Sequence, residues 1–201
     1  MIITPLQSRF ALPGRRRLAL VGLLIGLVVA GACDDPFAPR ATTSVRTDSF
    51  VVYAVSETPV NVPSAFNIVF FTPLRLEPTY GFDLVFDIDE SGEVVVIPAR
   101  LVGGAVTSNR FVGLQRVTGD YDDLTQAPVT GYEYDSTVTL GLREAVLVEL
   151  RADQCQFQTS QFLYSKIRIL AIDQTRRLLS FEITYDPNCG FRSFLPGVPT
   201  N

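Results

Sequence analysis

Hydrophobic and polar positions alternate over short segments of the chain, most clearly in residues 81–89. One face of this segment is apolar and contains Phe82, Leu84, Phe86 and Ile88. The other face contains Asp83, Asp87 and Asp89, with Val85 as its apolar exception. Because side chains of a strand alternate between two faces, this pattern predicts a β-strand with its Phe82 face toward a core.

Similar short runs, rich in Val, Ile, Phe, Tyr and Thr, recur between turn residues. They predict nine strands, at residues 49–56, 65–72, 81–89, 93–102, 110–117, 136–142, 145–151, 165–173 and 178–185. Residues 65–71 are apolar on both faces apart from Asn67, which is typical of a central strand. Two stretches leave a helical alternative open, residues 145–151 as a whole and one turn within 153–164.

This spacing predicts an all-β fold, a single β-sandwich or partly closed barrel of about eight to nine short, mostly antiparallel strands. The predicted domain covers residues 49–195, and residues 196–201 form a C-terminal tail. No pattern along this part of the chain predicts a second domain.

The N-terminal segment joins a basic cluster to an uncharged apolar run. Three arginines at positions 15–17 precede the run LALVGLLIGLVVAGA, residues 18–32. This order is typical of a secretory signal, and the run is shorter than the roughly 20 residues of a membrane-spanning helix. A faint twin-arginine pattern at Arg15 and Arg16 is an alternative export signal.

The small residues at positions 30–32 stand directly before Cys33 and resemble the lipobox of bacterial lipoproteins. The resemblance implies that the signal peptide 1–32 is removed and that Cys33 is lipidated. It also implies a bacterial cell-envelope protein on the inner or outer membrane, with its domain outside the cytoplasm. An ordinary secretory signal cut near Ala32 and an uncleaved anchor are the alternatives. Residues 33–48, rich in Pro, Thr and Ser, are expected to form a flexible tether.

Composition excludes several kinds of function. The 201-residue chain has no His and no Trp, which excludes His-dependent nucleophilic catalysis and His-containing zinc sites. Residues 1–32 hold four of the 17 basic residues and none of the 21 acidic ones, so the remainder carries 13 basic against 21 acidic residues, a formal charge of −8. An acidic body without a basic stripe predicts no nucleic-acid partner.

Cys155 and Cys189 remain once Cys33 is assigned to lipid. In an oxidising compartment two such cysteines are most simply paired, so we expect a disulfide that fixes the last hairpin. A reactive or metal-binding thiol pair is the rival interpretation, without a CxxC spacing to favour it.

Two acidic segments are candidate calcium sites. Asp87, Asp89 and Ser91, followed by Gly92, resemble the start of an EF-hand loop, but position twelve of that loop is Pro98 instead of Glu. The alternative is a β-hairpin turn with solvated acids. The loop 118–135 adds Asp120 and Asp122 among tyrosines, a composition that suits calcium, sugar hydroxyls or plain solvent.

The sequence therefore predicts a lipid-anchored, non-catalytic binding or structural module without a cofactor, whose partner is an envelope protein or a glycan. A calcium-dependent binding domain is the first alternative. A carboxylate-based hydrolase, which needs no His, is the second.

Overall fold

A computed structural model describes residues 38–77, 81–102, 111–158 and 160–200. The signal peptide and Cys33 lie outside these residues, so the structure does not test the lipobox. Residues from Arg40 onward form one unit of two antiparallel sheets.

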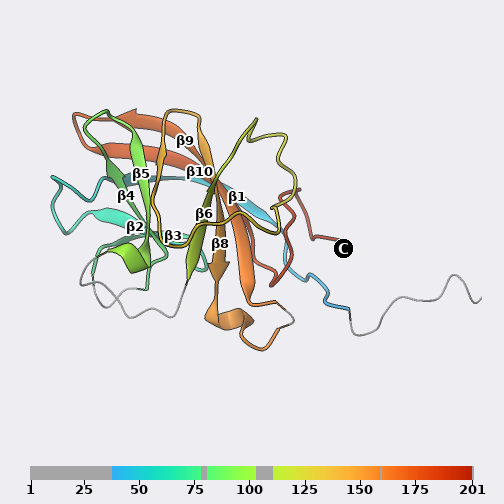
Figure 1. Ribbon diagram of the computed structural model, residues 1–201. Coiled ribbons are helices and arrows are strands. Elements are labelled where there is room, and N and C mark those ends of the chain that lie inside the picture. Colours follow the sequence, from blue (N-terminus) through green and yellow to red (C-terminus); the bar gives the residue numbers. More distant parts are fainter. Residues whose placement is uncertain (1–37, 78–80, 103–110, 159, 201) are drawn as a thin grey trace, which may run out of the picture. The chain divides into compact units, whose positions relative to one another are not determined.

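The first sheet contains the longest strands of the domain (Figure 1). Its order is β1 (Arg46–Tyr53), β10 (Leu178–Asp186), β9 (Phe162–Asp173), β8 (Ala145–Arg151) and β6 (Val112–Arg116). The second sheet has the order β3 (Thr72–Arg75), β2 (Pro63–Asn67), β4 (Leu84–Ile88), β5 (Val94–Pro98) and β7 (Val138–Leu140). Two short 3-10 helices, η1 (Ala99–Leu101) and η2 (Asp153–Cys155), complete the described elements. The predicted all-β class is confirmed, and the two separate sheets form a sandwich instead of a barrel.

Aromatic side chains join the two sheets in the core. Phe86 of β4 stacks on Phe181 of β10 at 4.8 Å between ring centroids, and Phe66 of β2 meets the same ring edge-on at 5.3 Å. All three rings are fully buried. Burying one such side chain contributes about 1.5–3 kcal/mol, so this cluster is a principal tie between the layers.

The predicted strand 65–72 is wrong as a single element. Strand β2 ends at Asn67, a turn occupies residues 68–71, and the chain reverses into β3. The buried Asn67 side chain ends the strand, since its Oδ1 accepts a hydrogen bond from Phe70 N at 2.7 Å. Phe71 then takes a positive φ of 56°. The apolar run hid this turn, because Ile68 and Phe71 enter the core from a chain reversal and not from an extended strand.

The start of the 81–89 segment also differs from the alternation that the sequence predicts. Strand β4 begins only at Leu84, and Phe82 packs with Val85 on the outer face of the second sheet instead of in the central core. Asp83, expected in solvent, is fully buried and accepts a hydrogen bond from Ile68 N at 2.7 Å. The period of two applies only where the backbone is extended, which excludes residues 82 and 83.

Of the two helical alternatives, residues 145–151 form strand β8, while η2 supplies the helical turn within 153–164. Backbone pairing also extends beyond residues 49–195 at both ends. Strand β1 starts at Arg46, inside the segment assigned to the tether, and Val45 N donates to Gly197 O at 2.8 Å.

Candidate functional site

The Asp89 side chain closes the hairpin between β4 and β5. Its Oδ1 accepts from Ser91 N at 3.0 Å, from Ser91 Oγ at 2.6 Å and from Glu93 N at 2.9 Å. The hydrogen bond from the Ser91 hydroxyl is the main reason that the pKa of Asp89 is lowered. Gly92 has a φ of +85°, the left-handed conformation that such a turn requires. Asp89 and Ser91 therefore have turn-forming roles within the protein.

Asp87 belongs to a different contact, with the β9–β10 hairpin. Its Oδ1 lies 2.9 Å from Arg177 Nη2, and its Oδ2 accepts from Ser56 Oγ at 2.5 Å. Glu57 Oε2 lies 3.6 Å from Nε of the same arginine. These groups line an open hollow of about 670 Å³ with Asp89, Glu90 and Gln174. Its four carboxylates face one guanidinium, so the hollow is acidic.

The 118–135 loop is fastened to the outer face of the first sheet. Figure 1 shows this loop, coloured yellow-green, running across β6 and β8. Lys166 of β9, the only lysine of the chain, donates to Tyr121 O at 2.7 Å and to Leu124 O at 3.0 Å. Its Nζ also lies 4.0 Å from the centroid of the Tyr121 ring, and burial lowers the pKa of this lysine. The loop is thus held over the sheet by the buried residues Tyr121, Ala127 and Tyr132, while its acidic residues stay exposed to solvent.

The acids of this loop serve the same attachment. Asp122 Oδ2 accepts from Arg168 Nη1 at 3.0 Å, and Asp120 Oδ1 accepts from Asp122 N at 3.0 Å. Among the described residues no three His, Cys, Asp or Glu side chains form a group suited to a metal ion. The structure therefore does not bring Asp87 and Asp89 together with Asp120 and Asp122, and calcium binding stays a prediction.

A buried carboxylate lies beneath the same loop. Glu149 of β8 is 6% exposed, and its two oxygens accept hydrogen bonds from the hydroxyls of Tyr164, at 2.9 Å, and Tyr134. Burial raises the pKa of both phenols, so they remain protonated donors. Gly113 allows Tyr132 and Tyr134 to approach the backbone of β6 closely, since a Cβ at residue 113 would lie 2.9 Å from Tyr132 Cβ and from Tyr134 Cε1. Glu149 thereby fixes the orientation of the Tyr134 ring.

Tyr134 forms part of a surface groove. An open hollow of about 270 Å³ is lined by Arg100, Phe111, Tyr134, Arg151 and Phe162. A second hollow of about 300 Å³ shares Phe111 and Arg151 with it and adds Ala152, Asp153, Gln156 and Gln161. We call the two together the aromatic–arginine groove.

The two arginines of the groove differ in their ion pairing. Arg100 pairs with Asp135, and its guanidinium lies 5.5 Å from the centroid of the Phe111 ring. The Arg151 guanidinium has no hydrogen bond or ion pair with any residue that the structure describes. Phe111 is 43% exposed. The groove thus combines exposed aromatic surface with a guanidinium that has no ion pair among the described residues, and Asp153 is the one carboxylate in its lining. This combination suits a ligand that has both an apolar face and a negative charge.

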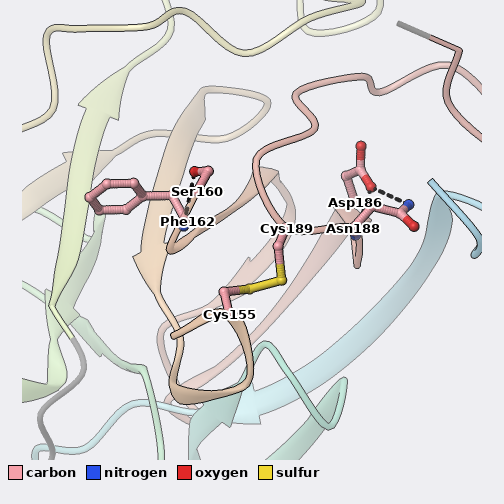
Figure 2. The surroundings of a disulfide bond; sticks show 6 residues. All are labelled: Cys155, Ser160, Phe162, Asp186, Asn188 and Cys189. Carbon is pink, nitrogen blue, oxygen red and sulfur yellow. Dashed lines mark hydrogen bonds between the residues drawn. A yellow bond between two sulfur atoms is a disulfide. The ribbon is translucent and has the colours of Figure 1, made fainter. Parts of the chain in front are cut away.

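The expected disulfide is confirmed. Cys155 in η2 and Cys189 after β10 are bonded, with their Cα atoms 5.6 Å apart (Figure 2). Figure 2 also shows Asn188, the neighbour of Cys189, turned toward Asp186. Asp186 is fully buried, and desolvation raises its pKa.

Comparison with known proteins supplies no further guide to function. No protein-family model, no curated protein and no solved structure matches the chain. Within the described residues no helix is long and apolar enough to cross a membrane.

Sequence reasoning missed the groove and the buried Glu149. Arg151 is distant in sequence from Arg100 and Phe111, and the three meet because η1, the start of β6 and the end of β8 lie on one side of the sandwich. For Glu149 a local signal existed, since it is the one charged residue among the apolar residues 145–150 of strand β8.

Proposed function

We propose that this protein is a lipid-anchored protein of the bacterial cell envelope that works as a non-catalytic binding module. The aromatic–arginine groove is the observation that carries the binding part of the proposal. The disulfide supports the location, because such bonds persist in oxidising compartments outside the cytoplasm. The anchor itself rests on the likeness of residues 30–33 to a lipobox.

The ligand that fits the groove is an anionic oligosaccharide. A sugar ring offers an apolar face to the exposed Phe111 ring, while its hydroxyl groups match the amides of Gln156 and Gln161. A carboxylate on the sugar would pair with Arg151, which has no ion pair among the described residues. The fixed Tyr134 ring adds a surface that needs no reordering on binding.

Binding is tested by calorimetry on the full chain with tetragalacturonate, an oligosaccharide of uronic acids, and with neutral cellotetraose. We expect the acidic oligosaccharide to bind more tightly. Arg151→Ala should weaken this binding about tenfold, as expected for one charged hydrogen bond, and Phe111→Ala about two- to tenfold.

Two matched variants control for surface changes outside the groove. Phe157→Ala removes an aromatic side chain that is 90% exposed, and Arg176→Ala removes an exposed arginine of the β9–β10 turn. Both should bind as the parent does. An equal loss of affinity for tetragalacturonate in all four variants would contradict the glycan proposal. So would a parent protein that binds neither oligosaccharide.

The anchor is tested separately by metabolic labelling with palmitate in a bacterial host. The parent protein should incorporate label and sediment with membranes, and Cys33→Ser should do neither. A soluble, unlabelled parent would contradict the lipid anchor while leaving the groove untouched.

A further inference from the structure

The Asn188 side chain holds the segment that enters the domain from the N-terminal side. Its Oδ1 accepts hydrogen bonds from Thr42 N at 2.9 Å and from Thr43 N at 3.1 Å. Its Nδ2 donates to Thr43 O at 2.7 Å. Three of its hydrogen bonds therefore go to one short stretch of backbone, which imitates the pairing of a neighbouring strand.

The position of Asn188 is set by a turn over residues 186–190. Asn188 is 7% exposed, and both its backbone N and its Nδ2 donate to Asp186 Oδ1, at 3.0 Å and 2.7 Å. Asp186 is the last residue of β10, so one side of the turn is fixed to the first sheet.

The other side of the turn is fixed by the disulfide. Cys189, next to Asn188, is bonded to Cys155 in η2 (Figure 2). Gly190 N donates to Phe162 O at 2.8 Å. The Gly190 backbone has a φ of +82°, and a Cβ there would lie 2.6 Å from Ser160 Cβ. The disulfide is thus the covalent link between this side of the turn and η2, beside the Gly190 hydrogen bond to β9.

We infer that the 186–190 turn is a redox-sensitive clamp on the N-terminal segment. A dithiol reductant breaks the Cys155–Cys189 bond, two electrons and two protons convert it into two thiols, and the reductant becomes a disulfide. The turn then loses its covalent support, Asn188 leaves its position, and Thr42 and Thr43 are released. This device is independent of the glycan proposal. If Cys33 carries lipid, the clamp also decides where the tether leaves the domain.

Amide hydrogen exchange of the full chain tests the clamp. The readout is the ratio of the exchange rates of Thr42 and Thr43 to that of Ile167, a core residue of β9. Asn188→Ala should raise this ratio about tenfold, because both amides lose their acceptor. Asn61→Ala, at an exposed asparagine of another loop, is the matched control and should leave the ratio unchanged.

Reduction with dithiothreitol, and the double variant Cys155→Ser with Cys189→Ser, should raise the ratio to a similar degree. A ratio that does not change on reduction overturns the redox coupling even if Asn188→Ala has its effect. Exchange that rises equally at Ile167 indicates global unfolding and overturns the clamp as a local device. An unchanged ratio in Asn188→Ala overturns the clamp altogether.

Discussion

Removal of the Cys155–Cys189 bond is the perturbation whose effect on stability follows most directly from the structure. The bond closes a loop with a sequence separation of 34 residues. The loop-entropy relation gives about 12.6 cal/mol/K for a loop of this length, or about 3.8 kcal/mol at 25 °C. For a domain of this size, such a loss lowers the melting temperature by about 8–15 °C.

The assay is urea unfolding of the variant with both cysteines changed to Ser, followed by circular dichroism because the chain has no Trp. Cys33→Ser is included in parent and variant, so that no third thiol exchanges with the pair. A second variant with Ala at both positions separates loss of the bond from burial of a hydroxyl, since Cys155 is fully buried. A loss below about 1 kcal/mol in both variants would refute the reasoning from chain entropy.

Two substitutions and one comparison of calcium with chelator test the polar contacts. Lys166→Met should lower the free energy of unfolding by about 2–3 kcal/mol, because the carbonyls of Tyr121 and Leu124 lose a charged donor; a loss below about 0.5 kcal/mol in urea unfolding would contradict this. Asp186 has a raised pKa in the fold, so its protonated form stabilises the native state and this contribution is lost as pH rises through the folded pKa. The stability of Asp186→Asn relative to the parent should therefore increase from pH 4 to pH 7. A difference in the free energy of unfolding in urea that stays constant with pH would argue against it. Thermal unfolding in calcium and in chelator should give equal melting temperatures, because the two pairs of candidate acids are occupied within the protein; a rise of several degrees in calcium would show preferential binding to the native state.

The strands could be predicted because their signals are local. The sequence pattern predicts strands at residues 178–185 and 145–151, and both are part of the first sheet. The disulfide could also be predicted, since counting left one pair of cysteines in the domain. In both cases the relevant information lies in neighbouring residues or in a simple count.

The burial of polar groups could not be predicted in the same way. Lys166 and Glu149 are typical surface residues, yet both are 6% exposed because the 118–135 loop covers them. Alternation along a strand shows which residues share a face, but it does not show what lies over that face. The cover comes from a segment of the chain whose acids and tyrosines were equally consistent with solvent.

The segments that pack on the outer faces of the two sheets decide where a ligand has access to the domain. Over β8 and β9, the outer face of the first sheet is covered by a cluster that includes Tyr132, Leu147 and Phe194. A smaller cluster around Phe82 and Val85 closes part of the outer face of the second sheet. Since these parts of the sheet faces are covered by the chain itself, binding surfaces are expected along the margins, where loops and strand ends meet. Both open regions described above lie at such margins, the acidic hollow at two hairpin turns and the aromatic–arginine groove beside η1 and the end of β8. In the hollow, the carboxylates Asp87 and Asp89 already accept hydrogen bonds from protein donors. In the groove, the Arg151 guanidinium has no acceptor among the described residues, so the groove is where an added ligand gains most.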